Sequence, residues 1–314
     1  MKNDYSFVNA TKQMKIIKSP LNYTGGKYKL LPQLLPLFPK SINTFVDVFC
    51  GGCNVAVNIS AKKIICNDID SNLIGLFSYF NKKNFAELFP AIKNVIKQFN
   101  LTDSSTNGYE FYNCNTANGL GNYNREGFLK LRERFNELDK DDENYYLFLY
   151  VLIVYSFNNQ IRFNSAGDFN LPVGKRDFNH RMQSKLNLFL SSLETKNITF
   201  TNTDFTKIKL EQLTQNDFVY ADPPYLITCA TYNEKKWNEN EEKRLLDYLD
   251  SLNENNVHFA LSNVLSTDNK TNEILNEWIN QRKYICHHLD FSYSNSSYHK
   301  KNIAKTDEVL ITNY

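Results

Sequence analysis

The chain has 314 residues, of which 42% are hydrophobic and 22% charged, and its formal net charge is +2. This composition is typical of a globular protein with ample length for a buried core. It excludes a membrane helix, because no apolar run approaches the ~20 residues required, and its small net charge does not by itself indicate a polyanionic partner. The first 20 residues are polar and contain no apolar signal core, so the expected location is the cytoplasm.

The first predicted elements alternate between strand and helix. Residues 42–50 are β-branched and aromatic and predict a buried strand that ends at glycines. Residues 54–62 then predict a short helix, and residues 63–70 a second strand. Ser71 is expected to cap a helix over 71–80. This order indicates the start of an open α/β sheet.

Residues 82–197 differ from the segments on either side, because their apolar residues mostly follow a helical period. A polar segment with Gly167, Pro172 and Gly174 predicts an exposed loop or hairpin within them. The helices are expected over 84–100, 124–139, 144–159 and 181–194, and the hairpin over 160–177.

The α/β pattern then resumes. Strands are expected over 197–205, 217–225, 257–264 and 307–314, with an amphipathic helix over 239–256. The sequence therefore predicts a discontinuous α/β domain, residues 1–81 and 198–314, with an insertion over 82–197.

Asp222-Pro223-Pro224-Tyr225 stand where the strand over 217–225 ends. Two prolines cannot continue a strand, and open α/β sheets bind ligands beyond the carboxyl ends of their strands. The two hydrogens of an exocyclic amino group suit the Asp222 carboxylate and the Pro223 carbonyl, while Tyr225 can stack on the base. The motif indicates a site for an amino-bearing base; the alternative is a turn that only closes the strand.

Two further segments suit a nucleoside cofactor. Asp68 ends the second expected strand and can accept both hydroxyls of a ribose, although an Asp there can also be a helix cap. The stretch from Tyr23 to Lys27, YTGGK, supplies a ring, a turn and a cation without the GxxxxGK[ST] spacing of a phosphate loop. Lys27 is expected to hold a carboxylate, and the alternative is an ordinary turn. Asp204, at the end of another strand, is expected to face the same crevice.

Taken together, these segments resemble the Dam-type DNA adenine methylase family. The resemblance rests on TGGK at 24–27, the strand–glycine turn–helix, Asp68 and DPPY, in this order. It extends over most of the chain, including IRFNSAGDFNLPVG in the insertion, FALSN at 259–263 and TDEVLITNY at the end. DPPY alone is shared with other amino-group methyltransferases.

The resemblance implies a Rossmann-like methyltransferase sheet with helices on both faces, plus a mostly helical inserted target-recognition domain. It implies methyl transfer from S-adenosylmethionine to the exocyclic 6-amino group of a flipped-out adenine in double-stranded DNA, without a metal. A cognate restriction endonuclease would be a genetic rather than a physical partner, an orphan or phage-borne enzyme is the alternative, and a monomer is the default. The implied catalytic residues are Asp222, Pro223, Pro224 and Tyr225. The residues implied to line the cofactor pocket are Tyr23, Lys27, Phe49, Gly51, Asp68, Asp204, Phe205 and Asp222.

The turn from Phe49 to Cys53, FCGGC, admits two interpretations. Two cysteines at this spacing can be a redox pair or half of a zinc site. The family turn instead reads Phe, any residue, Gly, any residue, Gly, and packs against the cofactor. No second cysteine or histidine pair completes a tetrahedral site, so the glycine turn is favoured. Cys53 replaces the usual last glycine and is expected to crowd the methionine part of the cofactor or to shift the backbone.

The loop over 158–175 is expected to meet DNA. Arg162 can read a guanine with two hydrogen bonds, or form a structural ion pair instead. The polar residues Asn159 and Gln160 depart from the small or apolar residues that commonly follow Asn158 in the family, so a GATC target is not transferred. The residues expected to contact DNA bases or phosphates are Asn158, Arg162, Asn164, Lys175, Arg176 and Arg181.

Three other interpretations stay open. The same chemistry can act on cytosine, on RNA or on a glutamine amide. A DNA-binding module that has lost catalysis is the second, and Cys53 is its support. The third is a thiol or zinc protein.

Overall fold

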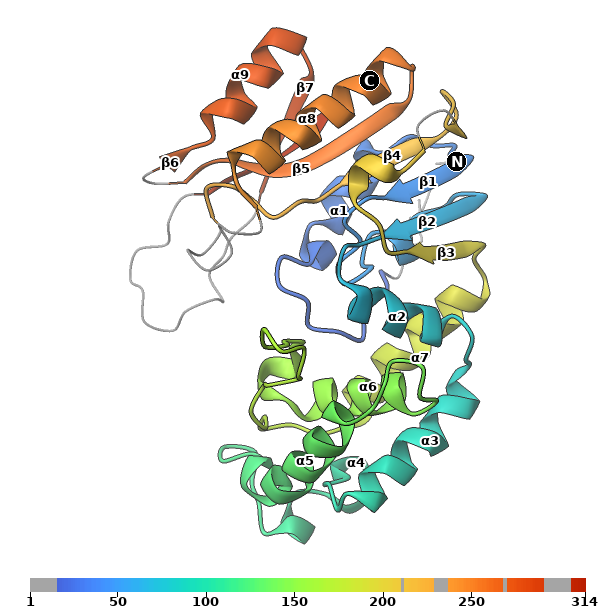
Figure 1. Ribbon diagram of the computed structural model, residues 1–314, viewed down its shortest axis with the longest axis vertical. Coiled ribbons are helices and arrows are strands. Elements are labelled where there is room, and N and C mark those ends of the chain that lie inside the picture. The colour runs from blue at the N-terminus through green and yellow to red at the C-terminus, as the bar shows by residue number, and fades with distance from the viewer. Residues whose placement is uncertain (1–15, 210–211, 229–236, 268–269, 291–305) are drawn as a thin grey trace, which may run out of the picture.

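The computed structural model describes residues 16–209, 212–228, 237–267, 270–290 and 306–314. They form a mixed α/β fold with a sheet-containing part and a helical part (Figure 1). No strand lies between residues 68 and 197, a range that contains the expected insertion.

The sheet runs in the order β3-β2-β1-β4-β5-β8-β7, with the short β6 paired to β5. The neighbours from β3 to β5 are parallel, whereas β8 pairs antiparallel with both β5 and β7. The carboxyl ends of the five parallel strands therefore share one edge, where ligands bind in open α/β sheets. The bounds are β1 Thr44–Asp47, β2 Lys63–Asn67, β3 Ile198–Thr201, β4 Phe218–Ala221, β5 His258–Thr267, β6 Lys270–Thr271, β7 Ile285–Leu289 and β8 Asp307–Thr312.

Apolar residues cover both faces of the sheet. Neighbours on β1 alternate, so Phe45 joins one buried hydrophobic cluster and Val46 the other. The cluster of Phe45 includes residues of α1 and α2, and that of Val46 includes residues of α8 and α9. These helices are α1 Leu31–Leu34, α2 Ser71–Phe80, α8 Glu239–Glu254 and α9 Glu273–Arg282. Helices thus pack on both faces.

The helical part surrounds α6, Tyr145–Tyr155, in which every residue except Tyr146 is buried. A helix that is apolar on all sides is stable only at the centre of a packed group. Below the sheet in Figure 1, the helices of this part gather around α6. They are α3 Phe85–Gln98, α4 Ser104–Asn107, α5 Gly121–Asn136 and α7 His180–Glu194.

Two local predictions are wrong. The helix expected over 54–62 is only the 3-10 turn η3, Ala56–Asn58, because the Asn58 side chain bonds to both backbone groups of Ile17 and to the carbonyl of Asn54. The cap of α2 is Asp70 rather than Ser71, and its carboxylate accepts the amides of Asn72 and Leu73.

The hairpin expected over 160–177 is present as isolated bridges, Ser156 with Val173 and Phe163 with Phe169.

The sequence analysis did not anticipate α9 and β7. Among the described residues, no helix is both long and apolar enough to cross a membrane.

Candidate active site

The ammonium group of Lys27 lies against the carboxylate of Asp222. Lys27 opens the 3-10 turn η1, Lys27–Lys29, and Asp222 follows β4, so the sheet brings two distant segments together. Lys27 Nζ is 2.8 Å from Asp222 Oδ1 and also donates to the carbonyl of Gly25 at 2.8 Å. Only 5% of the Lys27 side chain is exposed, so the pair is shielded from water. Gly25 has φ of +79°, a left-handed conformation that glycine adopts without strain.

Tyr225 and Glu308 complete this cluster. The Tyr225 hydroxyl lies 3.0 Å from Asp222 Oδ1 and 3.2 Å from Glu308 Oε1. Lys27 Nζ is 4.9 Å from the centre of the Tyr225 ring and 3.8 Å from Glu308 Oε1. Burial raises the pKa of the Asp222 carboxyl, although Lys27 and Tyr225 favour its ionised form. Sequence reasoning missed Glu308; the signal was an acidic residue directly before the run VLIT of the last strand.

The glycine turn after β1 packs under Tyr23. Gly51 has φ of +45°, and a Cβ atom there would lie 2.8 Å from the Tyr23 ring, so both the backbone and the contact require glycine. The Gly51 amide donates to Asp68 Oδ2 at 3.0 Å. The turn and the acid at the end of β2 therefore form one unit.

Cys53 also adopts a left-handed conformation, with φ of 57°, which explains why glycine suits this position. Its side chain is buried in the core beside Cys50 and Cys66. The Cys53 side chain therefore packs among protein atoms and does not reach solvent.

Asp68 and Asp47 are buried carboxyl groups at the ends of β2 and β1. Asp68 Oδ1 accepts the Asp70 amide at 3.0 Å, and burial raises the pKa of Asp68. Asp47 is 1% exposed, and its Oδ1 atom has no hydrogen-bond partner among the described residues. Burial, followed by the charges of Cys50, Asp222 and Asp68, raises the pKa of Asp47 well above its ordinary value.

Asp204 and Phe205 lie farther along the same edge. The Phe49 ring is tilted against Phe205 and meets Trp237 edge to face, with ring centres 5.5 and 5.6 Å apart, respectively. The Asp204 carboxylate bonds within its own turn to Thr206 and pairs with Arg244 at 3.1 Å. Phe49 and Phe205 are thus brought together, whereas Asp204 already has a cationic partner.

S-adenosylmethionine, the cofactor that the sequence resemblance implies, can be tested against these residues. The unpartnered Asp47 Oδ1 is an acceptor suited to an ammonium group, and the Asp68 carboxylate can accept hydroxyls. Ile69, beside Asp68, exposes 72% of its side chain and offers an apolar contact that sequence reasoning missed. Its signal was an apolar residue between two acids at a strand end. The residues present therefore fit a cationic nucleoside.

The residues expected to meet DNA lie between α6 and the start of α7. Arg162 donates to the side chain and the carbonyl of Asn170, and it forms no ion pair among the described residues. Asn164 shapes a turn, because its Oδ1 accepts the amides of Ala166 and Asp168. Asn158 has φ of 56°, and its carbonyl accepts the side chain of Asn22 at 3.0 Å.

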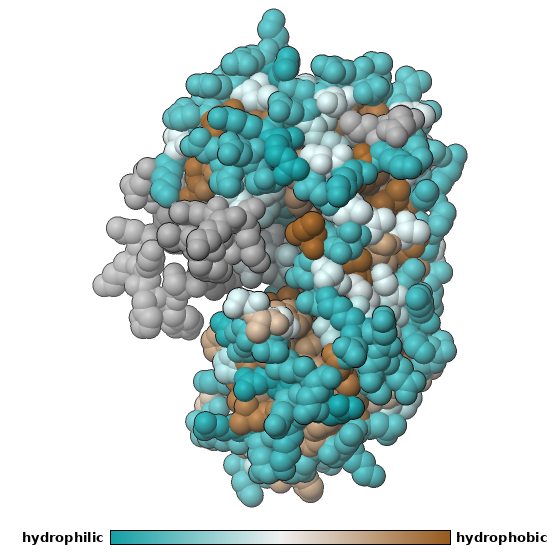
Figure 2. Space-filling view, viewed as in Figure 1, coloured by the Kyte–Doolittle hydropathy of each residue, from teal (hydrophilic) through white to brown (hydrophobic). Residues whose placement is uncertain are grey.

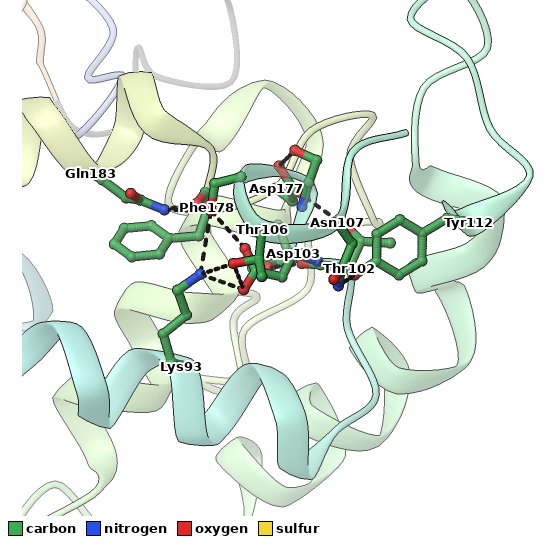
Figure 3. Close-up of polar contacts among 12 residues, drawn as sticks. Lys93, Thr102, Asp103, Thr106, Asn107, Tyr112, Asp177, Phe178 and Gln183 are labelled. Carbon is green, nitrogen blue, oxygen red and sulfur yellow. Dashed lines mark hydrogen bonds and ion pairs between the residues drawn. The ribbon is translucent and has the colours of Figure 1, made fainter. Parts of the chain in front are cut away.

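A buried polar network fixes the basic end of this loop (Figure 3). Asp177, directly after Arg176, is fully buried and accepts the amide and hydroxyl of Ser104 and the hydroxyl of Thr102. Asp103 pairs with Lys93 beside it. Lys175 and Arg176 themselves are exposed. Their segment is therefore held in place by Asp177 while their side chains reach solvent.

Other cations gather near Arg181, which lies in the first turn of α7. Burial, together with the charges of Lys18, Arg181 and Arg176, lowers the pKa of Lys185 to about 8. None of these four cations forms an ion pair within the part of the chain that the structure describes. Sequence reasoning missed Lys18 and Lys185, because their segments are far apart in the chain. The view in Figure 2 shows a largely hydrophilic face in which brown areas are small and separate.

The cysteines do not assemble a metal site within the described residues, where no group of three or more His, Cys, Asp or Glu could hold a metal ion. Cys50, Cys53 and Cys66 are buried as free thiols. Cys229 lies outside the described residues.

Comparison with known proteins adds independent evidence. A family model described as "D12 class N6 adenine-specific DNA methyltransferase" matches residues 23–293. "Type II methyltransferase M.FokI" of Planomicrobium okeanokoites is 43% identical over 98% of this chain, and "Modification methylase StsI" of Streptococcus sanguinis is 42% identical over the same share. This chain spans 44% of the length of each of these two relatives. "DNA adenine methylase" of Salmonella typhi is 26% identical over 80% of this chain and 82% of its own length.

Proposed function

Because the chain belongs to the D12 class N6 adenine-specific DNA methyltransferase family, we propose that it transfers a methyl group from S-adenosylmethionine to the exocyclic amino nitrogen of adenine in DNA. The observation that carries this proposal is the buried pair of Lys27 and Asp222 at 2.8 Å, where β4 runs into two prolines and Tyr225. It joins the two segments on which the sequence resemblance chiefly rests.

Asp222 and the Pro223 carbonyl would accept the two hydrogens of the amino group. The amino nitrogen is a weak nucleophile because its lone pair is delocalised into the ring, and two acceptors favour a tetrahedral nitrogen instead. Lys27 and Tyr225 both contact Oδ1 of Asp222 and thereby fix the orientation of the carboxylate. Oδ2 would then accept an N–H hydrogen of the amino group. Catalysis would rest on orientation and placed charge rather than on a strong base.

Asp68 would hold the ribose hydroxyls of the cofactor, and Asp47 Oδ1 its ammonium group. Tyr23, Gly51 and Phe49 would line the pocket. When bound, S-adenosylmethionine supplies an electrophilic sulfonium methyl group. Since Asp204 is paired with Arg244, its contribution would be to fix the turn that carries Phe205.

The substrate base must leave the duplex, because its amino group is inaccessible within the stack. We assign residues 1–81 and 198–314 to catalysis and residues 82–197 to target recognition. Phe157 exposes 51% of its side chain at the start of the recognition loop and offers an aromatic face for an unstacked base step. Arg176, Arg181, Lys18 and Lys185 form a positive surface suited to phosphates.

The relatives named as a type II methyltransferase and a modification methylase support a role in modifying DNA at a restriction site. The alternative function, a DNA-binding module that has lost catalysis, rests on Cys53. The Cys53 side chain is directed into the core, so nothing at this turn favours that alternative.

The test is transfer of labelled methyl from S-adenosylmethionine to unmethylated genomic DNA, followed by nucleoside analysis. Asp222→Ala runs beside the wild-type chain, with thermal unfolding to verify that it folds. We expect label in N6-methyldeoxyadenosine from the wild type and none from Asp222→Ala. Label in a cytosine nucleoside, or equal label from both chains, would contradict the assignment.

A further inference from the structure

Glu308 is a buried carboxylate in the last strand of the sheet. Its side chain is 2% exposed, whereas its neighbour Asp307 is 33% exposed and pairs with His288 at 2.8 Å. The two acids point to opposite faces of β8, as adjacent strand residues do. Hydrogen bonding of β8 to both β5 and β7 fixes the backbone that carries Glu308.

Two carboxylates share the Tyr225 hydroxyl. Asp222 Oδ1 lies at 3.0 Å and Glu308 Oε1 at 3.2 Å from the phenol oxygen, which has a single hydrogen to donate. The hydroxyl therefore lies between the two acids, and removal of either one would change its preferred direction. Because a phenol O–H prefers the plane of its ring, this direction also favours one orientation of the Tyr225 ring.

The same two carboxylates share one ammonium group. Lys27 Nζ is 2.8 Å from Asp222 and 3.8 Å from Glu308, and both Lys27 and Glu308 are almost fully buried. With both acids ionised, the cluster of Lys27, Asp222 and Glu308 carries one negative charge. A net negative site stabilises positive charge that develops on a nearby nitrogen.

We propose that Glu308 is a positioning residue of the methyl-transfer site, which holds the Tyr225 hydroxyl and the Lys27 ammonium so that the aromatic ring and the Asp222 carboxylate meet the adenine amino group together. This inference rests on the proposed function. It assigns to the last strand of the sheet a direct part in orienting the DPPY residues.

A double-mutant cycle tests the inference. Single-turnover methyl transfer at saturating DNA and cofactor is measured for the wild type, Glu308→Gln, Tyr225→Phe and the double variant, and thermal unfolding establishes that each one folds. Glu308→Gln should slow transfer by about tenfold or more, and the double variant should be within about twofold of Tyr225→Phe. Additive effects of the two substitutions would overturn a role that acts through Tyr225.

The pH dependence supplies a signature that a merely structural role would not produce. Removing the charge of Glu308 favours the ionised form of Asp222, so the acidic limb of the rate profile should move to lower pH. The groups that interact with Asp222 electrostatically include Lys27, Tyr225, Tyr23, Asp47 and Tyr220, and all of them are retained in the variant.

Asp307→Asn is the matched control, because it removes a carboxylate from the same strand on the other face. We expect its rate and its acidic limb to equal those of the wild type. A wild-type rate and profile for Glu308→Gln would contradict this inference alone. Absence of transfer by the wild-type chain would contradict the proposed function and, with it, the role of Glu308.

Discussion

The side chain of Asn22 donates a hydrogen bond to the backbone carbonyl of Asn158, with 3.0 Å between Nδ2 and the oxygen. Asn22 precedes Tyr23, whose ring covers Gly51, and Asn158 stands in a left-handed conformation at the start of the recognition loop. This hydrogen bond joins the segment that we assign to the cofactor to the segment that we assign to DNA.

Asn22→Ala should weaken DNA binding while leaving cofactor binding unchanged. An exposed hydrogen bond contributes about 1 kcal/mol, so we expect a loss of DNA affinity of about fivefold. DNA affinity is measured by fluorescence anisotropy and S-adenosylmethionine affinity by calorimetry. Asn280→Ala is the control, since Asn280 makes an exposed side-chain hydrogen bond on the remote helix α9. Equal DNA affinity of the two variants would refute the coupling.

Gly51→Ala should destabilise the chain and weaken cofactor binding. The new Cβ would lie 2.8 Å from the Tyr23 ring, and the left-handed backbone adds strain of about 1–2 kcal/mol. Gly108→Ala separates the two effects, because Gly108 also has positive φ but no atom within 4 Å of such a Cβ. Urea unfolding should show a larger loss for Gly51→Ala, and only that variant should bind the cofactor more weakly. Unaltered cofactor affinity in Gly51→Ala would argue against the proposed pocket.

The pKa shifts of two buried aspartates predict opposite effects of pH on stability. The folded pKa of Asp47 lies well above the unfolded value, so the folded state binds the proton more tightly. Its stabilising contribution is present below the unfolded pKa of about 3.9 and is lost as pH rises through the folded pKa. Asp47→Asn should therefore be at least as stable as the wild type at pH 8, and its advantage should disappear near pH 4.

Asp217 behaves in the opposite way. Burial alone would raise its pKa, but hydrogen bonds from Thr214 and Thr44 outweigh burial and lower it. This contribution is present above the unfolded pKa and is lost as pH falls through the folded pKa. Asp217→Asn should therefore lose stability at pH 8. Urea unfolding of both variants and the wild type from about pH 2 to pH 8 covers both titration windows, and pH effects of the same sign for Asp47 and Asp217 would contradict the assignment.

Arg176→Ala should weaken DNA binding in a way that depends on salt but not on sequence. A lysine or arginine that neutralises one phosphate contributes about one unit to the slope of log affinity against log salt. Lys130→Ala is the control, because exposed Lys130 pairs with Glu126 on α5. The slopes are obtained from the DNA affinity measured between about 50 and 200 mM salt, a range over which phosphate contacts strongly change affinity. A wild-type slope for Arg176→Ala would exclude a phosphate contact.

Much of the fold follows from local patterns in the sequence. The strands expected at 42–50, 63–70 and 217–225 are confirmed as β1, β2 and β4, because short runs rich in β-branched or aromatic residues that end at glycines, prolines or polar residues favour strands. The helix around Tyr150 is equally evident from its apolar run. At Asn58, tertiary contacts override the expected helix. The Asn58 side chain forms hydrogen bonds with the backbone of Ile17, which lies far away in the sequence.

The sequence by itself determined the family and the segments that carry chemistry, since TGGK, the glycine turn and DPPY are local patterns of residue type. Only the tertiary structure decided which groups meet. Lys27 in the turn η1 lies beside Asp222 after β4, although the two residues are far apart in the chain, and Glu308 lies near both because β8 returns antiparallel next to β5. The direction of the Cys53 side chain likewise depends on a left-handed backbone angle that the residue's identity disfavours. Pairing of distant strands and packing of buried charges are properties of the whole chain, and no local pattern encodes them.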